Sequence, residues 1–407
     1  MKRRLARGRI LATADDLTGA FDTAAAFAGR GLATEVLVAG RSLPRDWPRG
    51  RRAVVVNTGS RHAAPAEAAR RVTRAVRWAR ARGAAAFFKK TDSTLRGNIG
   101  AELAAFAAAT GAALVPFVPA YPAAGRTVEG GRLLVRGVPV HRTAFARDPG
   151  DPVRASRVAA AVARTSAIPV LATRDAGGRR PPPRSGRALL VPDVRTDRDL
   201  DRAAAAFARA GLLRCAAGSA ALAARVAARL AAGARPPRDA GWRRPVLIVN
   251  GSLQSVALAQ VRAGRDRRVA TLSLDGLRLG PRRPAAGDVA RAADALLRLE
   301  RDVILTSVAE RGEADRGGAF DAARELGRVV RAVVRRGHAF GALACFGGET
   351  TAAILGALRV RAVHPIRELW PGVVYSRLHA GRWRFDLITK SGGFGPADLV
   401  ARLVRGR

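Results

Sequence analysis

Short apolar runs alternate along the first half of the chain with longer segments whose apolar residues recur at helical spacing. Three of these runs have the length and composition of buried strands: residues 9–14, 53–57 and 84–88. Each is followed by a polar turn and then by a predicted helix, at 17–31, 65–82 and 99–111. The alternation predicts a parallel sheet that helices cover on both faces.

The same alternation resumes after residues 231–245, a segment rich in Pro, Gly and Arg that we interpret as a linker. Four apolar runs beyond the linker are predicted strands: residues 246–250, 303–307, 341–346 and 386–390. A chain of 407 residues exceeds the size of one ordinary core. We therefore predict an α/β protein with two domains, 1–235 and 245–407, each a mostly parallel sheet flanked by helices.

Residues 123–149 interrupt this pattern with several glycines. They predict two short strands around a turn, with Arg126, Thr127 and Glu129 in the loop. His141 lies in the same stretch, and we assign it no catalytic role because it has no partner at metal-binding spacing.

Polar residues gather where the strands of the first half end. Asp15 and Asp16 follow the strand at 9–14, Asn57 closes the strand at 53–57, and the decapeptide KKTDSTLRGN, residues 89–98, follows the strand at 84–88. Because ligands of open α/β sheets bind at the carboxyl ends of the strands, these residues predict a binding site. Two structural alternatives stay open: Asp15 or Asp16 caps the following helix, and Lys89, Asp92 and Arg96 form a salt-bridged turn.

Composition changes this picture mainly through its rare residues. Of 72 Lys and Arg residues only four are Lys, and two of these, Lys89 and Lys90, are adjacent. A compact ammonium on a flexible stem differs from a guanidinium fork, so these lysines indicate a need for a point charge. The formal charge of +40 suggests a nucleic-acid partner. The arginines are spread over every segment, however, and no nucleic-acid-binding motif is present, so we expect no specific nucleic-acid partner.

Cysteine usage and hydropathy indicate the cellular compartment of the protein. The two cysteines, Cys215 and Cys345, are too few for a disulfide framework, which fits a reducing cytoplasm. The apolar run near the start is broken by Asp15 and Asp16, too early for a signal peptide. No run approaches the roughly 20 apolar residues of a membrane helix, so we expect no membrane partner. The sequence does not predict the oligomeric state, and a homo-oligomer is among the states that stay open.

Small residues form the strand-to-helix turns of the second half. They occupy residues 250–252, 347–351 and 390–395. Glycines let a backbone approach a phosphate chain, hydroxyls add donors, and helix N-termini favour anions. Three such turns, one with the rare Lys390, predict a nucleotide site, although neither a Walker A motif nor a complete G-x-G-x-x-G is present.

Taken together, the motifs ADDLTGAFD, VVNTGSR, KKTDSTLRGNIGAEL, VPVHRTAFARDP, NGSLQSV, GGETTAAIL and KSGGFG resemble the four-carbon acid sugar kinase family. The likeness runs in order from about Arg9 to Val404. It implies an acid-sugar-binding N-terminal domain, an ATP-binding C-terminal domain and phosphoryl transfer to the terminal (C4) hydroxyl of a short sugar acid. One departure leaves the substrate preference open: Arg142 and Ala144 stand where relatives often have acidic residues.

The resemblance also implies site residues, in a cleft between the domains. The sugar acid is expected to contact Asp15, Asp16, Lys89, Lys90, Arg96 and Asn98, and the position of Asn57 at the same strand edge adds it to this set. ATP is expected to contact Ser252, Gly347, Gly348, Glu349, Thr350, Gly392 and Gly393, and on physical grounds Lys390 is a candidate phosphate contact. On physical grounds Lys90 or Arg96 binds the carboxylate, and Asp16 or Asp92 orients or deprotonates the hydroxyl. Mg²⁺ is expected with ATP, its ligands unassigned. A basic nucleic-acid-associated protein and a dehydrogenase-like α/β enzyme are the alternatives.

Overall fold

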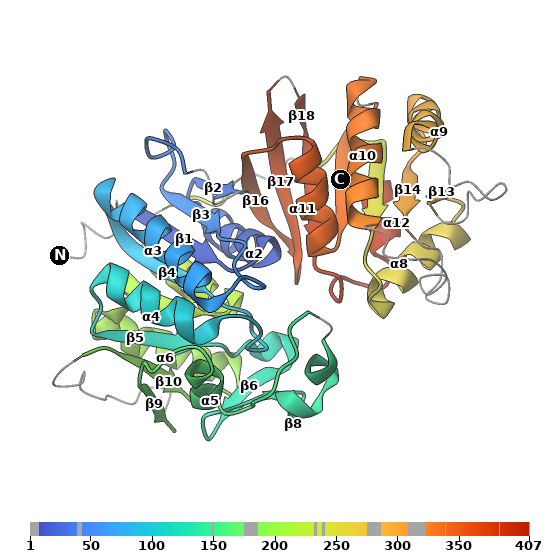
Figure 1. Ribbon diagram of the computed structural model, residues 1–407. Coiled ribbons are helices and arrows are strands. Elements are labelled where there is room, and N and C mark those ends of the chain that lie inside the picture. Colours follow the sequence, from blue (N-terminus) through green and yellow to red (C-terminus); the bar gives the residue numbers. More distant parts are fainter. Residues whose placement is uncertain are drawn as a thin grey trace. The chain divides into compact units, whose positions relative to one another are not determined.

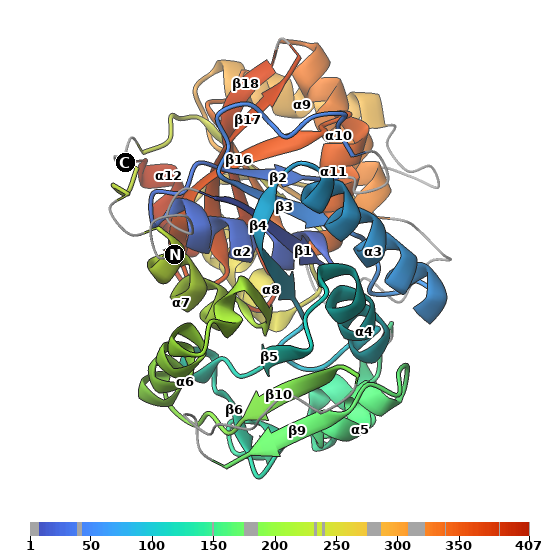
Figure 2. The same ribbon diagram turned by 90° about the vertical axis from the view of Figure 1, so that its left-hand side faces the viewer.

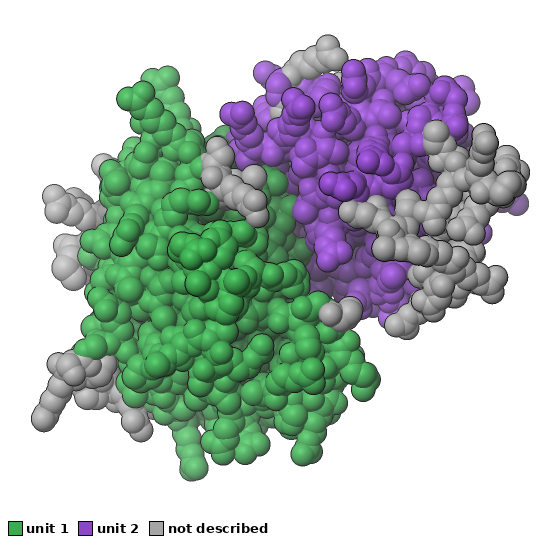
Figure 3. Space-filling model, viewed as in Figure 1, with its two compact units in different colours: residues 1–236 green, residues 237–407 purple. Residues whose placement is uncertain are grey.

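The computed structural model describes residues 8–38, 43–148, 150–174, 186–231, 234–237, 241–274, 286–307, 322–337, 339–381 and 383–406. The chain divides into two compact units, residues 1–236 and 237–407 (Figures 1 and 3). The linker predicted at 231–245 lies partly outside the described residues.

The main sheet of the first unit is parallel throughout, in the order β2-β3-β1-β4-β11-β5-β10-β9. Its strands are β1 Arg9–Ala14, β2 Thr34–Leu37, β3 Ala53–Asn57, β4 Ala84–Lys90, β5 Leu114–Val118, β9 Val170–Thr173, β10 Ala188–Pro192 and β11 Cys215–Gly218. The central strands are almost entirely buried and read as continuous apolar runs, as strands covered on both faces do.

Helices cover both faces of this sheet. They are α2 Leu17–Ala28, α3 Pro65–Ala81, α4 Ile99–Thr110, α5 Val158–Ala163, α6 Asp197–Arg209 and α7 Ala220–Leu230. Helix α3 packs against α4, and α2 packs against α7. Figure 2 shows the two pairs on opposite faces of the sheet. Short 3-10 turns occupy Pro122–Ala124 (η1), Val140–Arg142 (η2), Ala144–Arg147 (η3) and Leu212–Arg214 (η4).

A separate three-stranded antiparallel sheet, β6-β7-β8, also belongs to the first unit. Its strands are β6 Arg126–Glu129, β7 Arg132–Val135 and β8 Val138–Pro139. The prediction that Arg126, Thr127 and Glu129 lie in a loop is therefore wrong. They form β6, and Gly130 and Gly131, both with positive φ, make the turn into β7.

The second unit has a mixed sheet in the order β13-β14-β12-β15-β18-β17-β16. Its strands are β12 Val246–Asn250, β13 Ala270–Ser273, β14 Val303–Thr306, β15 Ala342–Phe346, β16 Ala362–Trp370, β17 Val373–Ala380 and β18 Trp383–Lys390. Five of them are parallel, whereas β17 and β16 are antiparallel additions that the sequence patterns did not predict.

The helices of the second unit are α8 Ser255–Asp266, α9 Ala286–Arg298, α10 Ala322–Arg335, α11 Gly348–Ala357 and α12 Leu399–Arg405. Helix α10 packs against α9 and α11, and α12 packs against α8. The predicted α/β class, with two mostly parallel sheets flanked by helices, is confirmed. None of the helices in the described part of the chain combines the length and apolar character that crossing a bilayer demands.

Candidate active site

The predicted polar edge of the first unit exists. Strands β3, β1, β4 and β11 are neighbours, and their last residues align: Asn57 with Ala14, Ala14 with Lys90, and Lys90 with Gly218. The loops that leave these strands therefore start side by side. The loop after β1 contains Asp15 and Asp16, the loop after β3 contains residues 58–63, and the loop after β4 contains the part of KKTDSTLRGN that follows Lys90.

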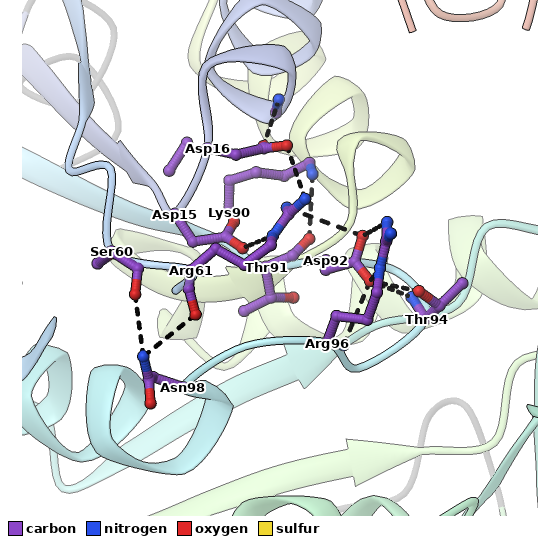
Figure 4. Close-up of polar contacts among 12 residues, drawn as sticks. Asp15, Asp16, Ser60, Arg61, Lys90, Thr91, Asp92, Thr94, Arg96 and Asn98 are labelled. Atoms are coloured by element: carbon purple, nitrogen blue, oxygen red, sulfur yellow. Dashed lines mark hydrogen bonds and ion pairs between the residues drawn. The ribbon is translucent and has the colours of Figure 1, made fainter. Parts of the chain in front are cut away.

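Arg61 is the centre of this edge (Figure 4). Its Nε lies 2.7 Å from Asp15 Oδ2, its Nη1 lies 2.7 Å from Asp16 Oδ2, and its Nη2 lies 3.8 Å from Asp92 Oδ1. One guanidinium thus links three carboxylates that come from two different strand ends. Burial by itself would raise the pKa of Asp15, but the charges of Arg61, Lys89 and Lys90 outweigh it, so this pKa lies below its ordinary value.

The two predicted aspartates differ in their surroundings. Asp16 caps α2, because its Oδ1 accepts a hydrogen bond from the Gly19 N–H at 2.8 Å. Its side chain keeps 27% of its surface exposed, against 1% for Asp15. Asp15 Oδ1 has no hydrogen-bond partner among the described residues. The capping alternative therefore applies to Asp16, while Asp15 retains an acceptor that the protein leaves unused.

Asp92 and Arg96 form the salt-bridged turn that was one of the open alternatives. Asp92 accepts from the Thr94 N–H and hydroxyl, from the Arg96 N–H, and from the Arg96 guanidinium at 2.9 and 3.0 Å. Arg96 Nη1 also donates to Asp148 at 2.9 Å. Burial would raise the pKa of Asp92, yet the charges of Arg96 and Arg61 hold it well below its ordinary value.

The adjacent lysines have different neighbours, because successive side chains of a strand point to opposite faces of the sheet. Lys89 is fully buried and pairs with Glu102 of α4 at 2.9 Å. Lys90 is 6% exposed, and its Nζ donates to the Thr91 carbonyl at 3.0 Å. Within the described ranges no carboxylate lies within ion-pairing distance of Lys90 Nζ. A Cβ added to Gly19 would come within 2.9 Å of this atom, which places it at the first turn of α2.

Both predicted asparagines of this edge bind backbone groups of the protein. The Asn57 amide donates to Val38 O at 2.9 Å and accepts from the Gly59 N–H. The Asn98 amide donates to Ser60 O at 2.9 Å and to Ala63 O at 2.8 Å. Together they fix the loop that carries Arg61.

Sequence reasoning did not list Arg61 among the site residues. Its signal was its place directly after a strand end, in VVNTGSR, but one Arg among so many carries little weight.

In the second unit the three predicted turns meet at one edge. Strands β12, β15 and β18 are neighbours, and Asn250 aligns with Phe346, which aligns with Lys390. A Cβ added to Gly392 would lie 2.6 Å from Ser252 Oγ, and one added to Gly347 would lie 3.3 Å from Ser252 Cβ. These three predicted contacts are therefore side by side.

Gly347 requires a glycine for a further reason. Its φ is +104°, which L side chains rarely adopt, and its N–H donates to Lys390 O at 2.9 Å. Helix α11 begins at the next residue, Gly348. In its first turn Glu349 is exposed and Thr350 is buried, and across the edge Gly393 is exposed.

Lys390 closes this edge in the way that Lys90 closes the other. It is 2% exposed, its Nζ donates to Gly392 O at 2.8 Å, and it lies 4.7 Å from the centroid of the Phe346 ring. In the described part of the chain it has no carboxylate partner, and burial lowers its pKa to about 7. The described residues contain no group of three acidic, His or Cys side chains placed to bind a metal ion.

Comparison with known proteins shows which family the chain belongs to. Residues 10–226 match a sugar-binding N-terminal domain, and residues 247–400 match a nucleotide-binding C-terminal domain. A D-threonate kinase of Bordetella bronchiseptica is 34% identical over 96% of this chain and 95% of its own length. The chain belongs to the four-carbon acid sugar kinase family.

Other members of this family match over a similar extent. A D-erythronate kinase of Heliobacterium modesticaldum is 31% identical, covering 97% of this chain and 96% of its own. A 3-oxo-tetronate kinase of Methylobacterium radiotolerans is 33% identical, covering 96% and 97%.

A solved structure from Salmonella typhimurium has the same fold, with a TM-score of 0.81, 23% identity, and coverage of 98% of this chain and 99% of that one. The family predicted from the motifs is confirmed, and it is favoured over the nucleic-acid-associated and dehydrogenase-like alternatives.

Proposed function

We propose that this protein transfers the terminal phosphoryl group of ATP to the C4 hydroxyl of a four-carbon acid sugar: D-threonate, D-erythronate or 3-oxo-tetronate. One observation carries the proposal. Each unit ends a central strand with a buried lysine, Lys90 or Lys390, that has no carboxylate partner among the described residues. A buried ammonium that forms no ion pair is costly, so each position is suited to an anionic ligand.

In the first unit this ligand is the carboxylate of the sugar acid. Lys90 Nζ lies at the first turn of α2, where the helix dipole adds a favourable field for an anion. The hydroxyls of the acid need both donors and acceptors. Asp15 Oδ1 and Thr91 Oγ1 are polar atoms near this lysine that have no protein partner in the described residues.

In the second unit the ligand is the phosphate chain of ATP. Ser252, Gly347 and Gly392 lie within side-chain reach of one another, and α11 starts beside them. Glycine turns and a helix N-terminus offer backbone N–H groups to phosphate oxygens, and Lys390 adds a charge. Glu349, Thr350 and Gly393 complete the proposed nucleotide contacts. Mg²⁺ enters as part of the MgATP substrate, since it is commonly held by phosphate oxygens, water and one or two carboxylates.

Asp16 is the proposed group that orients the attacking hydroxyl or takes its proton. It is the most exposed of the three carboxylates around Arg61, although one of its oxygens caps α2 and the other pairs with Arg61. Asp92 is less exposed and accepts five hydrogen bonds from Arg96 and Thr94. The shape of the acid site is therefore assigned to Asp92, Arg96, Asn57 and Asn98. Lys89 stabilises strand β4, which carries Lys90, through its ion pair with Glu102.

The reaction needs both substrates in line. The proposal accordingly includes an acid-binding domain, 1–235, a nucleotide-binding domain, 245–407, and a reactive complex formed between them.

The test is a substrate panel. Purified protein with ATP and Mg²⁺ is assayed for ADP release with D- and L-threonate, D- and L-erythronate and their 3-oxo forms. The phosphate ester is then located by ³¹P NMR. We expect acid-dependent ADP release and a C4 ester. A folded protein that releases no ADP with any of these acids, or that phosphorylates another hydroxyl, would contradict the proposal.

A further inference from the structure

Helix α7 begins without a cap. Ser219 occupies the position before its first residue, where a serine hydroxyl ordinarily accepts a hydrogen bond from a backbone N–H of the first turn. Here the hydroxyl instead donates to the Ala120 carbonyl at 2.6 Å, so it leaves the first turn uncapped. Within the described ranges, the N–H groups of residues 220–222 donate to no other group of the chain.

This helix start is buried. Ser219 and Leu222 have no exposed surface, Ala221 is 4% exposed, and Ala220 is half-buried. The first N–H groups of a helix have no partner inside the helix, and a buried helix start needs an acceptor from a side chain, water or a ligand. A buried donor that stays unpaired is costly. The start of α7 therefore requires an acceptor that the described part of the chain does not supply.

Thr91 connects this helix start to Lys90. Strands β4 and β11 are neighbours, and Lys90 is aligned with Gly218, the last residue before Ser219. The Thr91 N–H donates to the Gly218 carbonyl at 3.0 Å, and the Thr91 carbonyl accepts from Lys90 Nζ at 3.0 Å. Thr91 is fully buried, and its Oγ1 has no hydrogen-bond partner among the described residues. The ammonium and the start of α7 therefore lie on either side of one residue that has a hydroxyl to spare.

The Lys90 side chain lies on the face of the sheet that α2 and α7 cover. Lys89 lies on the other face, where it pairs with Glu102 of α4. Helices α2 and α7 pack against each other, and Lys90 Nζ lies beside Gly19, in the first turn of α2. Figure 4 shows the Lys90 side chain extending alongside Asp16, the residue that caps α2. Two helices thus begin on the face that Lys90 occupies, and only α7 begins uncapped.

Resting on the proposed function, we propose that the uncapped N-terminus of α7 is the second half of the carboxylate site. One carboxylate oxygen of the sugar acid accepts from Lys90 Nζ, and the other accepts from backbone N–H groups of residues 220–222. A carboxylate has two acceptor-only oxygens, more than one ammonium satisfies. The helix start adds donors and the positive end of the helix dipole, and the Thr91 hydroxyl adds a further donor. The acid thereby acts as the missing cap of α7.

The first test supplies the cap from inside the chain. In Ser219→Asp the new carboxylate can accept from the N–H groups of the first turn and so compete with the acid. With the best acid of the substrate panel, we expect the KM for the acid to rise about tenfold or more. The KM for ATP should stay within about twofold, and the melting temperature should not fall. Ser219→Asn, which is uncharged, should have a smaller effect. The matched control is Thr196→Asp, the same kind of change at the cap of α6, which should leave both KM values unchanged.

The second test removes one donor directly. Ala220→Pro deletes the N–H of the first helical residue, a position where proline is tolerated. The preceding residue, Ser219, already has the extended backbone that a following proline requires, with φ of −73° and ψ of 171°. We expect the KM for the acid to rise about fivefold or more while the melting temperature is retained.

The outcomes separate this inference from the proposed function. A wild-type protein that phosphorylates no acid overturns the proposed function itself. A wild type that is active on four-carbon acids, with an unchanged KM for the acid in both Ser219→Asp and Ala220→Pro, overturns only the α7 site. Equal increases in the KM values for the acid and for ATP also overturn it, because a carboxylate site affects one substrate. If Ser219→Asp does not fold, Ala220→Pro decides alone.

Discussion

The two units place polar residues at the same topological position, the carboxyl edge of a central parallel sheet, yet they fill it differently. In the first unit the edge is crowded with charged side chains that bind one another, with Arg61 between three carboxylates. In the second unit it is made of glycines and small hydroxyl residues around one lysine. Lys90 and Lys390 are the feature that both edges share.

The difference matches what each proposed ligand demands. A four-carbon acid is small and carries a distinct donor or acceptor on each carbon, so side chains in fixed positions are needed to recognise it. A phosphate chain presents repeated equivalent oxygens, and backbone N–H groups of glycine turns suit it without a set of particular side chains. We therefore expect the first edge to select its ligand by stereochemistry and the second edge to select its ligand by charge.

The largest expected effect separates a paired lysine from an unpaired one. Lys89→Met leaves Glu102 buried without its cation, and we expect the free energy of unfolding to fall by about 3–5 kcal/mol. Lys90→Met removes a cation that has no carboxylate partner in the described residues, so it should cost far less. Urea denaturation followed by circular dichroism measures both. Equal losses of stability would mean that the two lysines are both structural.

The next effect separates Asp16 from Asp92. Asp16→Asn keeps the size of the side chain but removes the oriented charge, and we expect kcat to fall about 10²-fold or more. Asp92→Asn disturbs the turn held by Arg96, so it should mainly raise the KM for the acid and lower the melting temperature. Steady-state kinetics and thermal melting distinguish the two. Unchanged kcat in Asp16→Asn would remove its proposed role.

A smaller effect tests the glycine edge. In Gly347→Ala the new Cβ would meet Ser252 and Thr350 at 3.3 and 3.4 Å, in a backbone conformation with φ of +104°. We expect the KM for ATP to rise about tenfold, since such strain costs on the order of 1–3 kcal/mol. The matched control is Gly356→Ala in α11, the helix that begins after Gly347, where a Cβ meets no atom within 4 Å. Equal behaviour of the two variants would argue against a phosphate-binding turn.

The smallest effect is a pH dependence that only the second edge should show. Because burial lowers the pKa of Lys390 to about 7, its charged fraction falls as pH rises above 7. The KM for MgATP should therefore increase about fivefold between pH 7 and pH 8 in wild type and stay flat in Lys390→Met.

The same lowered pKa fixes the sign of a stability effect. Between pH 7 and the ordinary lysine value of 10.5 the unfolded chain binds the extra proton, so the contribution of Lys390 to the free energy of unfolding rises with pH. A KM for MgATP that is independent of pH in wild type would contradict the environment described for Lys390.

Sequence patterns located the edges well because strand ends are marked by where an apolar run stops. The run 9–14, the helix that begins after Asp16 and the turns at 250, 347 and 390 all occur where they were predicted. Lys90 and Lys390 stood out because lysine is scarce in this chain.

Other features depend on contacts that a sequence does not show. Lys89 and Lys90 are neighbours in sequence, but only the packing of α4 against one face tells which of them is paired with Glu102. Arg61 was missed because its importance comes from ion pairs with residues far away in the chain. Strands β16 and β17 were missed because they are antiparallel additions to an alternating pattern that did not require them.

The central claim is that Lys90 binds the acid and Lys390 binds the nucleotide, and its most direct test is a crossed measurement of KM values. In Lys90→Met we expect the KM for the acid to rise about 10-fold or more, as for a lost charged hydrogen bond, with the KM for ATP within about twofold of wild type. In Lys390→Met at pH 7 the KM for ATP should rise and the KM for the acid should not. If either variant changes both KM values equally, or changes the KM of the other substrate, the assignment of one anion to each edge is wrong.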